Sequence, residues 1–268
     1  MRLHQALQAR VKALRIAISS HNLSLEPFES VLEKICKEFK AWEIIAEYEH
    51  SLPKIKSELQ VAIDSYDIRF SIHSPLSDIN IASLNENLRK ASINELRKGI
   101  EISSMLGIEL FTFHAGLLSP LGVLAVEKVR DVNKKSIKEI SRFGEEYSIN
   151  LALENFPKHS WCLCQSYDEI AETIEGTGIN ICFDVGHAFT TGEIENFLCN
   201  HERIANVHLH DNYGGRDIHL PLGKGRIDFK TIVPKLLKVY KGDLVIEAGS
   251  ISEGVKGREF LERIISSQ

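Results

Sequence analysis

The sequence lacks the features that most quickly reveal a membrane protein or a secreted domain. No apolar run approaches the ~18 residues that a membrane-spanning helix needs, so we expect no such helix. The five cysteines are an odd number spread over 268 residues, which is not typical of a disulfide scaffold and favours a cytoplasmic location. The opening stretch, MRLHQALQARVKALRIAIS, is amphipathic and does not have the pattern of a signal peptide.

A strong charge of one sign is also absent. The chain carries 32 basic and 37 acidic residues, a net charge of −5, which offers no general attraction to nucleic acid or to an anionic membrane surface. A glycine-rich phosphate loop is missing as well, because SSHNLSLEP follows the first predicted strand. That absence disfavours the open, doubly wound sheet that binds nucleotides, which is the alternative fold.

The sequence does contain one repeated alternation of strand and helix patterns. Eight apolar runs are predicted strands: residues 15–19, 42–47, 69–73, 109–114, 150–154, 180–184, 206–210 and 244–247. Helical patterns follow them: residues 27–38, 53–66, 87–106, 123–147, 167–174, 193–199, 229–240 and 257–265. Strands separated by helices pair in parallel, so eight such units predict a closed (β/α)8 TIM barrel. We expect residues 1–268 to form it as a single domain.

Histidine, aspartate and glutamate recur where these apolar runs end. The set comprises ten residues: His73, His114, Glu154, Asp184, His187, His208, His210, Asp217, His219 and Glu247. The carboxyl ends of barrel strands meet at one mouth, so residues that lie far apart in the sequence would converge there. Buried charge is costly unless it is paired, and a divalent cation would satisfy the whole set. The sequence therefore predicts a metal site.

Single members of such a set also have ordinary structural explanations. A lone histidine at a strand end is more often a hydrogen-bonded structural residue than a metal ligand. His208 and His210 share one face of their strand, so one can bind metal with the other beside it. Glu43 and Glu47 of the second predicted strand could face the mouth, but Glu43 lies in mid-strand, where it could instead pair with a neighbouring base. We interpret Cys162 and Cys164 as core or loop thiols and assign them no function.

The motifs resemble those of a known superfamily. In order they read HSP, FHAG, ENF, CFDVGHA, VHLHDN, DIHLPLGKGRIDF and IEAG, which is similar to the xylose-isomerase-like barrels. That superfamily includes sugar isomerases and epimerases and also endonuclease IV. The resemblance covers nearly the whole chain. It is specific for the fold and for metal binding, and it says little about the substrate.

The resemblance to the sugar isomerases and epimerases implies one divalent ion: manganese, cobalt, magnesium or zinc. The ligands would be Glu154, Asp184, His208 and Glu247. It also implies that Glu154 and Glu247 are the catalytic pair, one removing the proton next to a sugar carbonyl and the other returning it. His187 would contact substrate hydroxyls, and Asp217 with His219 would close the mouth.

The resemblance to endonuclease IV implies instead three zinc ions that cut the phosphodiester at abasic sites in DNA. Each ion would have its own ligands: His73, His114 and Glu154 for the first; Glu154, Asp184, His208 and Glu247 for the second; His187, Asp217 and His219 for the third. Nucleic acid is a partner only under this alternative. His210 is left as a substrate-binding or additional metal residue under either reading.

Three departures favour the sugar isomerases and epimerases over the nuclease. The loop after His73 reads SPLSDIN, without the tyrosine or the aliphatic run that the nuclease carries there. The stretch LPLGKGRIDF is typical of the sugar enzymes. The net charge is negative, and no interleaved arginine and aromatic loops for gripping a duplex are evident. We therefore expect a sugar or sugar-phosphate isomerase or epimerase, with the nuclease as the alternative and another metal-dependent lyase or dehydratase, or a degenerate binding barrel, as a third class.

Overall fold

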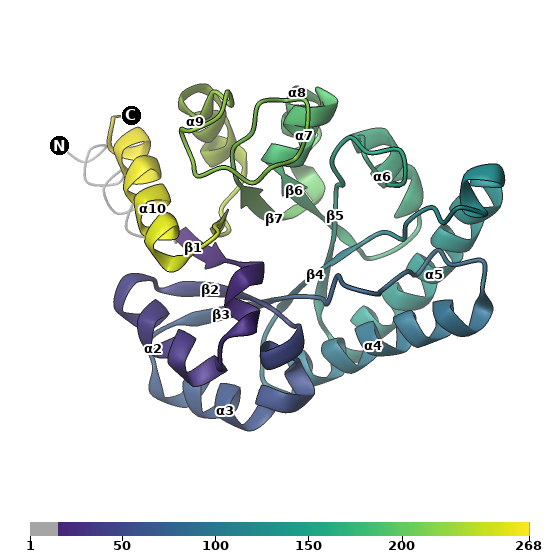
Figure 1. Cartoon of the computed structure of the whole chain (residues 1–268), viewed down its shortest axis with the longest axis horizontal. Helices are drawn as coiled ribbons and strands as arrows, with labels where there is room; N and C mark the ends of the chain where they lie inside the picture. Colours follow the sequence, from purple (N-terminus) through teal and green to yellow (C-terminus); the bar gives the residue numbers. More distant parts are fainter. Residues whose placement is uncertain (1–15, 268) are drawn as a thin grey trace.

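The computed structural model describes residues 16–267, in which eight parallel strands close into a barrel in chain order (Figure 1). The strands are β1 (Ile16–Ser19), β2 (Ala41–Ile45), β3 (Arg69–His73), β4 (Leu110–His114), β5 (Asn150–Glu154), β6 (Asn180–Asp184), β7 (Ile204–Leu209) and β8 (Leu244–Glu247). The barrel closes where β1 pairs with β8, with Ser19 opposite Glu247. The predicted TIM barrel is confirmed. Arg15, expected to begin the first strand, and residues 1–14 of the amphipathic opening stretch lie outside the described residues.

Helices cover the outside of the barrel (Figure 1). They are α2 (Phe28–Glu38), α3 (Leu52–Ser65), α4 (Glu86–Met105), α5 (Val126–Tyr147), α6 (Tyr167–Thr173), α7 (Val185–Thr191), α8 (Ile194–Cys199), α9 (Phe229–Val239) and α10 (Ile251–Ser266). Short 3-10 turns are η1 (His21–Leu25), η2 (Tyr48–His50), η3 (Gly122–Leu124) and η4 (His201–Arg203). None of the helices in this part of the chain is long and apolar enough to cross a membrane.

Two helices differ from the sequence-based expectation. α7 follows β6 directly and was not predicted, because VGHAFTT contains a glycine and two threonines, which are poor helix formers. It forms because the side chain of Asp184 accepts a hydrogen bond from the amide of His187 and caps the first turn. α10 begins at Ile251 rather than Gly257, because Ser250 caps it by accepting from the amide of Glu253.

The apolar core lies between the strands and the helices. Phe183 of β6 stacks on Phe197 of α8, with ring centroids 4.8 Å apart, and both are fully buried. Burying an aromatic ring of this kind stabilises the fold by about 1.5–3 kcal/mol. Strand side chains on the other face point into the barrel, where Asn206 of β7 reaches Thr112 of β4 at 2.9 Å. The barrel interior is therefore polar near the mouth.

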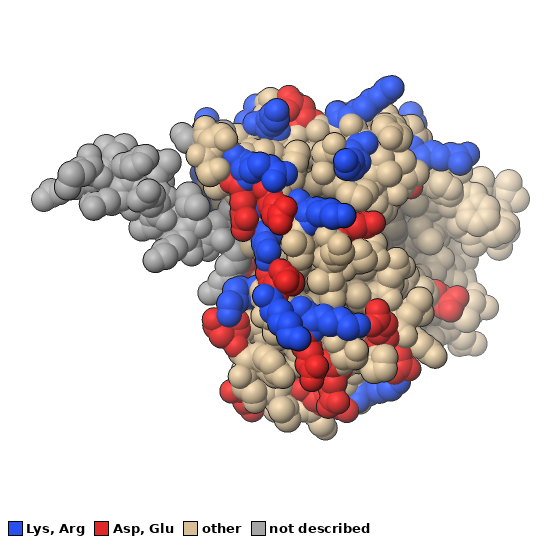
Figure 2. Space-filling view, turned by 60° about the vertical axis from the view of Figure 1, so that its left-hand side comes forward, with Lys and Arg blue, Asp and Glu red and all other residues tan. Residues whose placement is uncertain are grey.

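The face of the molecule in Figure 2 carries charges of both signs. Lysine and arginine side chains lie there among aspartate and glutamate side chains. Among the exposed charges of residues 16–267, Arg258 of α10 pairs with Glu38 of α2. Exposed pairs of this kind contribute little stability. This face therefore offers no continuous basic surface for a nucleic acid backbone.

We expect Gly116→Ala to destabilise the barrel. A Cβ on Gly116, in the loop after β4, would lie 2.2 Å from the Cβ and 2.3 Å from the backbone nitrogen of Ala82. Because a backbone atom cannot move aside freely, the free energy of unfolding should fall by about 1–3 kcal/mol in urea denaturation. Gly215→Ala, with open space around its Cβ, is the matched control and should change it by less than about 0.5 kcal/mol. Equal stability of the two variants would show that the loop adjusts.

Candidate metal centre

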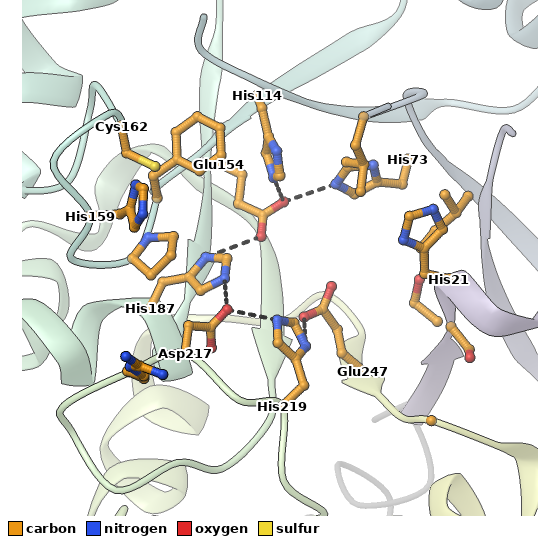
Figure 3. Close-up of a pocket in the computed structure, with 18 of the residues that line it drawn as sticks. His21, His73, His114, Glu154, His159, Cys162, His187, Asp217, His219 and Glu247 are labelled. Carbon is orange, nitrogen blue, oxygen red and sulfur yellow. Dashed lines mark hydrogen bonds and ion pairs between the residues drawn. The ribbon is translucent and has the colours of Figure 1, made fainter. Parts of the chain in front are cut away.

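The ten predicted residues converge at the carboxyl end of the barrel, beside a cavity of about 880 Å³ (Figure 3). Seven of them line the cavity: His73, His114, Glu154, His187, Asp217, His219 and Glu247. The other three, Asp184, His208 and His210, are fully buried around its floor. The strand ends thus bring together residues from β3 to β8, as the barrel prediction requires.

Glu154, the last residue of β5, lies at the centre of the site with only 1% of its surface exposed (Figure 3). Its Oε2 atom is 2.9 Å from Nε2 of His73 and 2.8 Å from Nε2 of His114. Its Oε1 atom is 3.3 Å from Nδ1 of His208 and 3.6 Å from Nδ1 of His187. Each carboxylate oxygen therefore faces two imidazole nitrogens.

The acids and histidines form three adjoining groups whose donor atoms lie within 4.8 Å of one another. The first group is His73, His114 and Glu154; the second is Glu154, Asp184, His208 and Glu247; the third is His187, His210, Asp217 and His219. Glu154 belongs to the first and the second. The second group holds the four ligands that the one-ion prediction requires, and the three together hold those of the three-ion prediction. The assignment of ions to these groups remains a prediction.

Several buried polar atoms of the site have no hydrogen-bond partner. They are Oδ2 of Asp184, both ring nitrogens of His210, Oδ1 of Asp217 and Oε2 of Glu247. A buried group left unpaired costs about 1–3 kcal/mol, so such atoms are rare without a reason. Imidazole nitrogens and carboxylate oxygens are ligands that suit zinc, manganese and cobalt. The residues therefore fit divalent cations.

A model of the xylose isomerase-like TIM barrel family matches residues 37–264. The chain belongs to this family. Among curated relatives, an uncharacterized protein of Methanocaldococcus jannaschii is 34% identical over 262 residues, 94% of this chain and 89% of the relative. A probable endonuclease 4 of Aquifex aeolicus is 30% identical over 176 residues, which is 58% of this chain and 61% of that relative.

Solved structures of similar fold include both epimerase-related and zinc-binding proteins. A D-tagatose 3-epimerase-like protein has a TM-score of 0.87 at 32% identity, covering 94% of this chain and 97% of its own. The IolI protein with a bound zinc atom has a TM-score of 0.77 at 17% identity, covering 95% of this chain and 99% of its own. The second likeness shows the shared fold of the xylose isomerase-like family.

In this xylose isomerase-like barrel, Glu43 supports the floor of the site. It is fully buried in β2, as is His208, and its Oε1 lies 2.7 Å from Nε2 of His208, which confirms the expected pairing with a base. Its Oε2 accepts a hydrogen bond from Asn206 at 2.6 Å. Nδ1 of His208 then faces Glu154 and Glu247, at 3.3 and 3.2 Å. Sequence reasoning did not place Glu43 in the site because its partners lie on a distant strand.

The loop that carries Asp217 and His219 is held by a residue that sequence reasoning also missed. The buried Asp211 carboxylate accepts hydrogen bonds from four backbone amides: Asn212, Gly223, Gly225 and Ile227. These bonds fix both ends of the loop at the barrel mouth. A Cβ on Gly225 would lie 2.2 Å from Oδ1 of Asp211, so only glycine fits there. The Asp-Asn pair ahead of several glycines was the available signal, since it is typical of turns.

Glu47 was expected as a residue that could face the mouth, but its pairing with His21 at the rim was not predicted. Nε2 of His21 lies 2.6 Å from Oε2 of Glu47, and His21 lines the cavity. The Glu47 carboxylate also accepts hydrogen bonds from the backbone amides of Leu76 and Ser77. Glu47 thus connects the loop after β3 to the loop after β1. The pair gave little sequence signal because its members are 26 residues apart in separate loops.

The thiols near the site are not suited to reactivity. Cys162 lines the cavity, and burial raises its pKa to about 11. Burial likewise raises the pKa of Cys164 to about 12. Both thiols therefore stay protonated at neutral pH, which is consistent with assigning them no function.

The histidines and carboxylates of the mouth change one another's proton affinity. Burial lowers the pKa of His187, but Asp184 and Asp217 outweigh it and raise the pKa to about 10. Burial also lowers the pKa of His219, yet Asp217 and Glu247 raise it to about 9. In turn, His187 and His219 overcome the effect of burial and hold the pKa of Asp217 far below its usual range. The site therefore attracts positive charge strongly.

We expect the metal-free protein to lose stability as the pH rises from about 6.5 to about 10. Protonated His187 and His219 have folded-state pKa values above the ordinary 6.5, so their contribution is complete below pH 6.5 and is lost as the pH passes the raised values. Urea denaturation of chelator-treated protein at a series of pH values measures this. Saturating zinc should remove the decline, because ions bind more tightly as protons leave. A metal-free stability that is constant across this range would contradict the expectation.

Proposed function

We propose that the protein is a divalent-metal-dependent enzyme that hydrolyses phosphate esters with three cations at the barrel mouth. The observation that carries the proposal is the position of Glu154 between two ligand groups. Its Oε2 is within 2.9 Å of two imidazole nitrogens, and its Oε1 faces the second group. A carboxylate placed in this way is suited to bridge two ions. Neither of its oxygens is free of an imidazole neighbour.

A phosphate ester is the substrate class that suits a cluster of cations. Divalent ions, when bound, lower the pKa of water toward neutrality and neutralise charge on the phosphate oxygens. The chain's residues supply the rest of the environment. Phe156 packs against His114 with ring centroids 4.5 Å apart and keeps water from that side of the first group. The cavity of about 880 Å³ admits a substrate of small-molecule size.

Two cationic side chains in the cavity favour an anionic substrate. Lys158, in the loop after β5, and Arg216, in the loop after β7, both line the cavity and are exposed. Neither forms an ion pair with any carboxylate among residues 16–267, so both remain available to an anion. Their position attracts a phosphate group locally, even though the whole chain has a net charge of −5. The likeness to a probable endonuclease 4 makes abasic DNA one substrate to test.

A sugar epimerase or isomerase with one ion is the second candidate. The observation that favours it is that Glu154 and Glu247 flank the same ring, with oxygens 3.3 and 3.2 Å from Nδ1 of His208. Two carboxylates on opposite sides of one ion could exchange the proton next to a carbonyl. The likeness to a D-tagatose 3-epimerase-like protein, at 32% identity, also supports a sugar substrate.

Metal content separates the two candidates. We expect close to three equivalents of zinc per chain in protein purified without chelator and without a histidine tag. The zinc-loaded protein should cleave bis(p-nitrophenyl) phosphate or an abasic duplex. One equivalent, together with epimerisation of a ketose and no phosphoester cleavage, would replace the proposed function with the second candidate. Elemental analysis and the two assays measure these outcomes directly.

His114→Ala tests the role of the first group. Under the proposal it should remove one metal equivalent and lower phosphoesterase activity at least about 100-fold, because a direct ligand is lost. Under the one-ion alternative, metal content should stay at one equivalent. His201→Ala is the control, because His201 lies in η4 and bonds only the carbonyl of Leu198. Full metal content in both variants would remove the first group from the cluster.

A further inference from the structure

We propose that His210 is a fourth protein ligand in the third group, so that the ion of this group is held by four protein ligands that it shares with no other ion of the cluster. The inference rests on the proposed metal cluster and adds a residue that neither ligand set implied by the resemblance includes. The third group would then be His187, His210, Asp217 and His219, a set of four donors within 4.8 Å of one another. Four protein ligands are typical of closed, structural zinc sites.

Metal binding would explain why the His210 side chain is buried without hydrogen-bond partners. Its ring is fully buried, and neither ring nitrogen has a hydrogen-bond partner. Nε2 lies 3.2 Å from Asp184 and 3.5 Å from Asp217, and it is 4.0 Å from Glu247. Each of these three residues also has a buried oxygen without a partner. An unpaired imidazole among unpaired carboxylates is the arrangement that a cation would satisfy.

The spacing of the third group suits tetrahedral zinc. With bonds of about 2.0–2.1 Å, ligand atoms around such an ion are roughly 3.3–3.4 Å apart. Oδ2 of Asp217 is 3.2 Å from Nε2 of His187 and 2.9 Å from Nε2 of His219. Oδ1 of Asp217 is 3.5 Å from Nε2 of His210. Asp217 therefore lies near the required separation from each of the three histidines.

The fold holds the His210 ring in this position. A Cβ on Gly186 would lie 2.1 Å from the ring, so glycine at the start of α7 is what allows the imidazole to pack there. On its other side the ring stacks on His219, with centroids 3.8 Å apart and planes 12° from parallel. The stacked rings both direct Nε2 toward Asp217.

A third group with four protein ligands has a different role from the first group. Because β-strand residues alternate, His208 and His210 share a face of the chain at β7, and each serves a different group. An ion with four protein ligands keeps no open position for water or substrate, so it anchors the loop that carries Asp217 and His219. The first group, with three protein ligands, keeps an open position. The second group also offers four protein ligands, but it shares Glu154 with the first group, so chelators should remove the ion of the third group last.

His210→Asn tests the inference with zinc alone as the probe. Zinc-loaded wild type and variant are dialysed against increasing chelator, and the zinc left per chain is measured. We expect wild type to retain a final equivalent after the others are lost. The variant should lose that equivalent at a chelator concentration roughly 10-fold lower or less, because one direct ligand is missing. His201→Asn, outside the cavity, is the matched control and should behave as wild type.

X-ray absorption of the wild type holding only its last zinc provides a second measurement that needs no variant. Three imidazoles and one carboxylate around that ion are expected, and two imidazoles would overturn the inference. Equal chelator resistance of a folded His210→Asn protein would also overturn it. A wild type that binds only one equivalent in total would instead contradict the three-ion function. The two failures are therefore distinguishable.

Discussion

The structure of the barrel mouth depends on the electrostatic pairing of buried carboxylates with imidazoles. Glu154 and Asp184 are almost completely removed from water at the ends of neighbouring strands, and Glu247 is largely buried two strands further along. Carboxylates this close repel one another unless positive charge lies between them. Histidines from β3, β4 and β7, from α7 and from the segment after β7 face these carboxylates. Those with a raised pKa, such as His187, supply that charge as protons, and cations would supply it more strongly. The positions of the loops follow from this requirement.

The barrel brings the residues at the strand ends together, and the loops add the remaining residues of the site. Parallel strands in chain order end at one rim, so β5 to β8 deliver the second group from four neighbouring positions. The third group cannot be built from strand ends alone, because Asp217 and His219 follow β7 by several residues. Asp211 holds their loop in place, because its carboxylate accepts hydrogen bonds from backbone amides at both ends of the loop. His219 itself has a positive φ of 43°, a strained conformation of the kind that clusters at functional sites.

The sequence predicted what depends on local pattern and missed what depends on distant contacts. Each strand and helix repeats a short signal, so all eight strands were found, whereas α7 lacked the signal because its glycine and two threonines are poor helix formers. Glu43 was not placed in the site because its partner Asn206 is 163 residues away. The motifs gave the ten site residues but not how many ions they hold. That number depends on the directions in which the ring nitrogens and carboxylate oxygens point in the folded protein, and local sequence patterns do not encode those directions.

The orientation of Glu154 links geometry to the choice of reaction. A glutamate that moves a proton needs one oxygen free to approach the substrate, because geometry limits proton transfer before pKa does. Oε2 of Glu154 instead lies between His73 and His114, which both reach it from neighbouring strands. In the second group alone, the same residue would be free to act as a base. Under the proposed function, these two histidines are therefore what turns a site suited to one ion and proton transfer toward one suited to several ions and phosphate.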